Sequence, residues 1–197
     1  MKLLYTKRSP YARKARIIAL EKGIKIEFIN EDLANKSPLL MKSNPVAKVP
    51  TLIVDDKTIL CDSPLICEYL DTLTPSPRFI PQDPIKRLAV LNTAAIADGM
   101  MDITIALYME KIRHPKDYNE KFVDLNTAAV ERLLEYFNGQ VADLKAWHLG
   151  SVGVVCALGY LQFRIPDLYR AGKYSKLNDW YQQVAERQSV KDTIPVV

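Results

Sequence analysis

The alternation of apolar and polar residues changes its period several times along the chain, and each change predicts a new element. Residues 2–6, "KLLYT", form a short strand-like run, and the segment from 9 to 23 carries its apolar residues at helical spacing. Residues 24–33 alternate as a strand does, and residues 51–62, "TLIVDDKTILCD", indicate two strands joined by a tight polar turn. With an irregular segment before the hairpin and a helix after it, this order predicts a small mixed sheet flanked by helices.

The second half of the chain has only helical periodicity. Prolines at 75, 77, 81 and 84 interrupt the pattern first, and neither a helix interior nor a central strand accepts them. Helices are then predicted over residues 85–112, 119–138, 151–164 and 175–187. The fold class is therefore α/β followed by all-α, with a first domain over 1–76, a linker over 77–84 and an all-α domain over 85–197.

Composition indicates a soluble globular protein and a small ligand. Of 197 residues, 48% are apolar, which is ample for a core, and we identify no apolar run near the roughly 20 residues that span a bilayer. The start of the chain becomes charged too early for a secretory signal, so the expected compartment is the cytoplasm. The net charge of +4 suits small anions better than a nucleic acid. We therefore expect neither a nucleic-acid nor a membrane partner.

The cysteines and histidines do not predict a disulfide framework or a metal site. Cys61, Cys67 and Cys156 are odd in number and lack CxxC spacing, so they are interpreted as small core residues. His114 and His148 have no cysteine at ligand spacing, and no metal site is expected.

Three predicted helices open with a capping residue followed by proline. The pairs are Ser9-Pro10, Ser63-Pro64 and Asp83-Pro84, and such a pair suits a helix start because proline lacks the N–H that would be unpaired there. Taken alone, Ser9 is therefore interpreted as an N-cap. Only its surroundings can favour a chemical role.

Three stretches of the first domain supply those surroundings. "SPYARK" at 9–14 follows the first strand, "NPVAKVPTL" at 44–52 places Val49-Pro50 before the third, and "CDSPLICEYL" at 61–70 places an acid and a serine after the fourth. An X-Pro bond before a strand can be cis. With the helical second half and the end at 177–195, "LNDWYQQVAERQSVKDTIP", the whole chain resembles the cytosolic glutathione transferases, and looks like a bacterial, serine-type member.

This resemblance implies a thioredoxin-like N-terminal domain with the order βαβαββα, which binds glutathione as co-substrate, and a helical domain that forms the pocket for a small hydrophobic electrophile. Ser9 is implied to be the catalytic residue, donating its hydroxyl hydrogen to the glutathione sulfur and favouring the thiolate. Lys7, Arg8, Arg13, Lys14 and Arg16 add positive potential, although for each of them a solvated helix face is the expected role.

Further residues are implied to bind the rest of glutathione. The main chain of Val49, oriented by Pro50, pairs with the cysteinyl part; Asp62 takes the γ-glutamyl ammonium; and Ser63 takes its carboxylate together with the helix N-terminus. These roles are compatible with a strand-entry proline and an ordinary N-cap.

The glycyl carboxylate has two candidate partners, Lys36 and Lys48, with a solvated loop lysine as the alternative for Lys36. Asp98 or Asp102 in "ADGMMD" could also reach glutathione, but either could equally be a surface acid.

The chain departs from its relatives in two places. Some classes carry a cysteine at the catalytic position, and serine there weakens thiol-exchange activities, although glutathione-dependent disulfide reduction or peroxidase activity stays open. Many relatives also carry an aspartate three residues after the cap of the buried helix; here the expected cap Ser151 is followed by Val154. We expect that capping box to be incomplete, at a cost of about 1 kcal/mol.

The alternative to an enzyme is a transferase-like fold that acts as a protein-interaction module of the starvation-response type and has lost glutathione. A homodimer is expected from the resemblance alone. Met100, Met101, Tyr108 and Tyr160 are candidate pocket liners, with core packing as the alternative for each.

Overall fold

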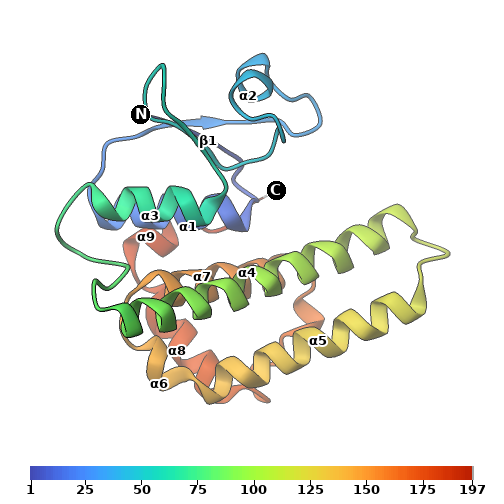
Figure 1. Ribbon diagram of the computed structural model, residues 1–197. Helices are drawn as coiled ribbons and strands as arrows, with labels where there is room; N and C mark the ends of the chain where they lie inside the picture. The colour runs from blue at the N-terminus through green and yellow to red at the C-terminus, as the bar shows by residue number, and fades with distance from the viewer. Residues whose placement is uncertain (197) are drawn as a thin grey trace.

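Four short strands form one mixed sheet in the order β2-β1-β3-β4 (Figure 1). The computed structural model describes residues 1–196. The elements of the α/β half are β1 Lys2–Tyr5, α1 Pro10–Glu21, β2 Glu27–Asn30, α2 Pro38–Ser43, β3 Thr51–Ile53, β4 Ile59–Cys61 and α3 Ser63–Thr72. Strand β1 is parallel to β2 and antiparallel to β3, which is antiparallel to β4. The predicted order is confirmed, and the segment expected to be irregular contains the short helix α2.

The second half is helical throughout its described residues. Its elements are α4 Pro84–Arg113, α5 Glu120–Gly139, α6 Val141–Leu144, α7 Leu149–Arg164, the 3-10 turn η1 Pro166–Leu168, α8 Ser175–Ala185 and α9 Gln188–Lys191. Helices α1 and α3 lie between the sheet and this helical half, while α2 lies on the far side of the sheet (Figure 1). The fold class predicted from the sequence is confirmed, whereas the exact domain bounds stay a prediction.

Helix α7 is the central helix of the second half. Every residue from Leu149 to Leu161 is buried, and α7 packs along α4. The helices come close because Gly153 faces Ala97: a β-carbon on that glycine would lie 3.1 Å from the Ala97 β-carbon. The apolar circumference of this helix therefore serves packing, as its sequence predicted.

The start of α7 corrects the expected cap. His148 is the N-cap, and its Nδ1 accepts from the Ser151 N–H at 3.1 Å, while the Ser151 Oγ accepts from the His148 N–H at 2.9 Å. The capping box is thus complete and begins three residues earlier than expected. Imidazole is not among the common caps, which is why the pattern pointed to Ser151 instead.

Helix α4 corrects the expectation that no apolar segment approaches the length of a membrane span. An 18-residue window of this helix has a mean hydropathy of 1.3, so by length and composition alone the helix could cross a membrane. It packs against α7 and α5, and it carries Asp98, which pairs with Lys14. Within the fold, 33% of that window is buried, where α4 packs against these helices.

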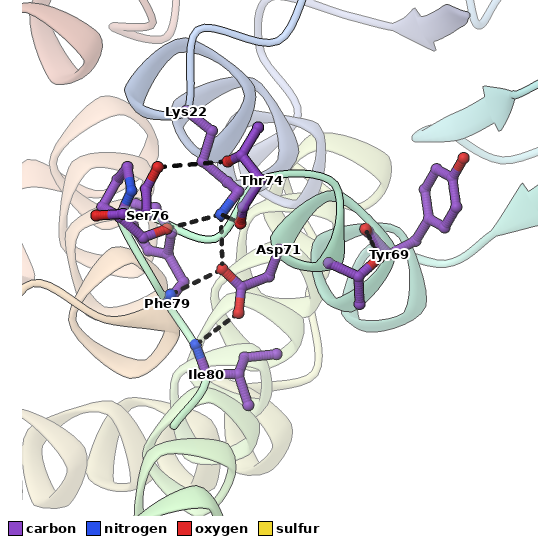
Figure 2. A network of polar contacts seen from close by, with 9 residues as sticks. Lys22, Tyr69, Asp71, Thr74, Ser76, Phe79 and Ile80 are labelled. Atoms are coloured by element: carbon purple, nitrogen blue, oxygen red, sulfur yellow. Dashed lines mark hydrogen bonds and ion pairs between the residues drawn. The ribbon is translucent and has the colours of Figure 1, made fainter. Parts of the chain in front are cut away.

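The segment between α3 and α4 is irregular but firmly held (Figure 2). Lys22, buried at the end of α1, donates to Asp71 Oδ1 at 3.2 Å and to the carbonyls of Thr74 at 3.0 Å and Pro77 at 2.6 Å. Asp71 in turn accepts from the N–H groups of Phe79 at 2.8 Å and Ile80 at 2.9 Å. A buried ion pair whose remaining atoms are hydrogen-bonded thus ties the ends of α1 and α3 to the segment that leads to α4.

Candidate active site

The sheet topology brings the three sequence motifs to one edge. Leu4 of β1 is paired with Thr51 of β3, and Thr51 is paired with Cys61 of β4. Because neighbouring strands are antiparallel here, the end of β1, the start of β3 and the end of β4 lie side by side. The residues that follow or precede those strand ends, Ser9, Val49 and Ser63, are therefore neighbours along this edge.

Ser9 is the N-cap of α1 and is half-buried. Its Oγ accepts from the Ala12 N–H at 3.2 Å, and Pro10 occupies the first helical position. A hydroxyl has one hydrogen and two lone pairs, so this cap leaves the Ser9 hydrogen free to be donated. The cap interpretation is confirmed, and it is compatible with a second role for the same hydroxyl.

Only some of the cations near Ser9 are solvated. Lys7 and Arg8 are exposed, but Arg13 and Lys14 are 2% and 1% exposed. The expected solvated face is therefore wrong for these two. Their spacing was a signal of burial, because each lies four residues before an apolar core residue, Ile17 or Ile18, on the same helix face.

Arg13 and Lys14 bind the helical half to α1. Arg13 donates to the Val190 carbonyl at 3.2 Å and to Thr193 Oγ1 at 3.3 Å, and it fits beside Gly159, where a β-carbon would lie 2.3 Å from its Nη1. Lys14 contacts both carboxylate oxygens of Asp98, at 2.5 and 2.7 Å.

Tyr11 adds a third link between α1 and the helical half, since its hydroxyl donates to Asp102 of α4. Burial, with the Asp102 contact, raises the pKa of Tyr11, so the phenol keeps its proton. Burial also raises the pKa of Asp98, against the opposing effect of Lys14. Both acids that could have faced a ligand thus already contact α1.

The Val49-Pro50 bond is cis, and Pro50 is buried. Asn44 holds the preceding loop, because its side-chain amide donates to the Lys48 carbonyl at 3.0 Å and to Thr51 Oγ1 at 2.9 Å. Within residues 1–196 the main chain of Val49 has no hydrogen-bond partner. An extended peptide could therefore pair with it, as a strand does with a sheet edge.

The start of α3 differs from the expected N-cap. Asp62 is the cap, with its Oδ1 accepting from the Ser63 N–H at 2.8 Å, and Ser63 is the first helical residue. Ser63 is fully buried, and its Oγ has no partner among the described residues. Asp62 has φ of 74°, a region uncommon outside glycine and found often at functional sites.

Lys36 and Lys48 are both exposed and flank α2. Neither forms an ion pair within the part of the chain that the structure describes. Both are therefore free to meet an anion.

The three cysteines of the described chain are free thiols. Cys67 and Cys156 are buried, and burial raises their pKa values to about 12 and about 11. Burial also raises the pKa of Cys61, which is half-buried. The cysteines are therefore poor nucleophiles, and two of them are core residues as expected. Residues 1–196 contain no group of three or more His, Cys, Asp or Glu side chains placed to bind a metal.

Two cavities lie away from Ser9. One, of about 160 Å³, lies beside the segment between α3 and α4 and is lined by Glu68, Arg78 and Arg87 among others. The other, of about 420 Å³, is an apolar groove between α4 and α5. Neither is lined by Ser9, Val49, Asp62 or Ser63.

Comparisons with known proteins agree with this geometry. Residues 3–78 match the glutathione S-transferase N-terminal domain family. An uncharacterized GST-like protein of Escherichia coli, YibF, is 36% identical over 168 residues, which cover 83% of each chain.

Solved structures extend the match to the whole chain. A glutathione S-transferase from Methylobacillus flagellatus with glutathione bound has a TM-score of 0.93 and 37% identity, covering 99% of both chains. A glutathione transferase family member from Pseudomonas fluorescens with bound S-(propanoic acid)-glutathione has a TM-score of 0.90 and 32% identity, covering 100% of both chains. This chain belongs to the glutathione S-transferase family.

Proposed function

We propose that this protein is a glutathione transferase that binds glutathione along the edge formed by Ser9, Val49 and Ser63. The observation that carries the proposal is the convergence of three sets of available hydrogen-bonding groups on that edge. From β1 to β4 the edge spans two strand spacings, about 10 Å, which is close to the length of an extended tripeptide. Bound glutathione in the Methylobacillus relative supports the same assignment.

Ser9 acts at the sulfur end in this proposal. Its oxygen is fixed by the Ala12 N–H, so its hydrogen is donated outward to the sulfur and favours the charged form. The α1 N-terminus and the exposed cations Lys7 and Arg8 add positive potential, which lowers a thiol pKa from its usual value of about 8.5. Serine does not remove the proton itself; solvent receives it.

The other end of the peptide lies at the start of α3. Ser63 can donate its unpartnered hydroxyl to the γ-glutamyl carboxylate, and the N–H groups of the first helical turn add to that site. Asp62 binds the ammonium group. The Val49 main chain pairs with the middle of the peptide, and either Lys36 or Lys48 binds the glycyl carboxylate.

Glutathione supplies a thiolate that forms a carbon–sulfur bond with a small electrophile, either displacing a leaving group with its bonding pair or adding to an activated double bond. The electrophile lies on the helical side, beyond Tyr11 and Asp102. Met100 and Met101 are fully buried and belong to the core, so other residues line that pocket.

We further propose a cytoplasmic homodimer. Leu65 of α3 and Ile85 and Leu88 of α4 are 51%, 74% and 64% exposed, and the apolar groove between α4 and α5 is also open. A second copy is the expected cover for so much apolar surface. Leu88→Glu should give a monomer in analytical ultracentrifugation; an unchanged mass would remove this face from the interface.

The test of the function is a pair of measurements on the purified protein. Calorimetry should show saturable binding of glutathione, and a neutral aryl halide should be conjugated faster than in the absence of protein. Absence of binding at millimolar glutathione would contradict the proposal and favour a protein-interaction module.

A further inference from the structure

A caged arginine lies at the end of α7. The Cζ atom of Arg164 lies 4.2 Å from the centre of the Phe163 ring, 4.4 Å from that of Tyr108 and 5.6 Å from that of Tyr160. Its Nη1 donates to the Tyr108 hydroxyl at 3.1 Å. Three rings and one hydrogen bond therefore hold the guanidinium in one orientation, and α4 and α7 both contribute.

One edge of this guanidinium has no partner. The Nε of Arg164 is buried without a hydrogen bond, and among residues 1–196 no carboxylate lies within 4 Å of the side chain. By contrast, Arg87 contacts Glu68 and Arg187 contacts Glu21. Leaving a buried donor unpaired is costly, and the Nε–Nη2 edge matches the two oxygens of a carboxylate.

The cage lies on the electrophile side of Ser9. Gly159, the residue before Tyr160, packs against Arg13, since a β-carbon on it would lie 2.3 Å from the Arg13 Nη1, and Arg13 belongs to the helix that Ser9 caps. Arg164 follows Tyr160 by one turn on the same face of α7. Tyr108 lies six residues beyond Asp102 on α4, a rise of about 9 Å away from the Tyr11 contact.

A purely structural role explains only part of this arrangement. A cation in the last turn of a helix is favourable, and Arg164 is the basic residue in the last turn of α7. Lysine would serve that purpose equally. Neither the stacking on Phe163 and Tyr108 nor the unpaired Nε follows from it, because both depend on the planar fork that only arginine has.

We propose that Arg164 is a specificity-determining residue that binds a carboxylate on the electrophilic co-substrate, so that acidic electrophiles are preferred over neutral ones. This inference rests on the proposed glutathione transferase function. The carboxylate is a spectator in the reaction: sulfur bonds to the electrophilic carbon, the leaving group departs with its bonding pair, and Arg164 keeps its protons throughout.

The first test compares a chloronitrobenzoate with its methyl ester, which share the reacting carbon and differ in charge. Arg164→Gln should lower kcat/KM for the acid by about 10- to 100-fold and for the ester by less than about threefold. Arg164→Lys should recover part of the acid activity. Arg113→Gln removes a charge from the last turn of α4 and is the matched control, with no selective loss expected.

The second test measures binding alone. Calorimetry with S-carboxyalkyl and S-alkyl glutathione of equal chain length should show that Arg164→Gln weakens only the carboxylated ligand. An equal loss for both ligands, or for acid and ester, would overturn the role of Arg164 while leaving the transferase function in place. Failure of the wild type to bind either ligand or glutathione would overturn both. Should Arg164→Gln unfold, the same two ligands are compared with Arg164→Lys. A loss for the carboxylated ligand alone would support the role of Arg164, and an equal loss for both ligands would overturn it.

Discussion

The starts of α1 and α3 share the dipeptide Ser-Pro but use their serines differently. Ser9 is an N-cap whose oxygen accepts from Ala12, whereas Ser63 lies inside its helix and Asp62 caps it instead. The helix thus occupies a lone pair of Ser9 and leaves its hydrogen free, while the whole hydroxyl of Ser63 is unpartnered among the described residues. Ser-Pro identifies a helix start, but it does not tell which hydroxyl is left for a ligand.

The two helix starts also differ in how they are anchored. Tyr11, Arg13 and Lys14 tie the first turns of α1 to the helical half. Helix α3 is held instead at its far end, through Asp71 (Figure 2). We infer that the sulfur-binding end of the edge depends on packing between the two halves at the first turns of α1, whereas the contacts of α3 with the later chain, at Glu68 and Asp71, lie beyond its first turn.

Breaking the α1 anchor should have the largest effect. Lys14→Met leaves Asp98 without its partner in a largely buried setting and should lower the free energy of unfolding by about 3–5 kcal/mol, measured by urea titration. Lys2→Met, which removes an exposed pair with Glu27, is the control and should cost less than about 1 kcal/mol. A Lys14 effect as small as the control would contradict a structural role for this pair.

The same variant should show a defined pH dependence. Burial holds the pKa of Asp98 above its unfolded value, so the folded state binds the proton more tightly than the unfolded state. The deficit of Lys14→Met should therefore be smallest below about pH 4 and grow as the pH rises through the raised pKa. A deficit that shrinks with rising pH would show that Asp98 is not the group left unpaired.

Removing the Ser9 hydroxyl should affect turnover next most strongly. Ser9→Ala should lower kcat/KM with a neutral aryl halide about 100-fold, because a donor to the developing thiolate is lost, and should cost about 1 kcal/mol of stability as a lost cap. Asp83→Ala, which removes the cap of α4, should cost similar stability with turnover unchanged. Equal turnover losses in both variants would reduce Ser9 to a capping residue.

Ser63→Ala should separate the two serines. Losing a hydrogen bond to a carboxylate should raise the Kd for glutathione about 10-fold in calorimetry. Because the buried hydroxyl has no partner in the described chain, stability should stay the same or rise, unlike that of Ser9→Ala. Ser175→Ala, an exposed serine at the start of α8, is the control. A stability loss without weaker binding would contradict the assigned role.

Asp62 should give the smallest effect. Asp62→Asn keeps an amide oxygen for the cap and tolerates the positive φ, so its Kd for glutathione should rise only about threefold through the lost exposed charge. Asp62→Gly should relieve the backbone while weakening binding at least as much. Unchanged binding in both variants would remove Asp62 from the ammonium site.

Local patterns predicted most of the fold. Strand alternation in 51–62 and helical spacing after 85 depend on neighbouring residues, so one sequence was enough for the elements and their order. The cap at His148 could not be predicted, because histidine is an unusual N-cap. The spacing of Arg13 and Lys14 was a local signal of burial, but their partners lie far along the chain, at Val190 and Asp98, and could not be predicted from it.

The site was predictable only where it adjoins the start or the end of a strand. Ser9, Val49 and Ser63 adjoin elements that the sequence located, so their meeting follows from the pairing of β1, β3 and β4. The Arg164 cage combines side chains of α4 and α7. The relative register of two packed helices cannot be predicted from the sequence of either helix alone. A lone basic residue ending an apolar helix, as in "SVGVVCALGYLQFR", was the one available signal.

The pKa of the glutathione thiol bound to the wild type and to Ser9→Ala, measured from the ultraviolet absorbance of the thiolate across a pH titration, tests the central claim most directly. We predict a value below about 7.5 in the wild type, and a rise of at least about one unit in Ser9→Ala. A wild-type value near the free thiol's, about 8.5, or equal values in both proteins, would contradict the assignment of Ser9.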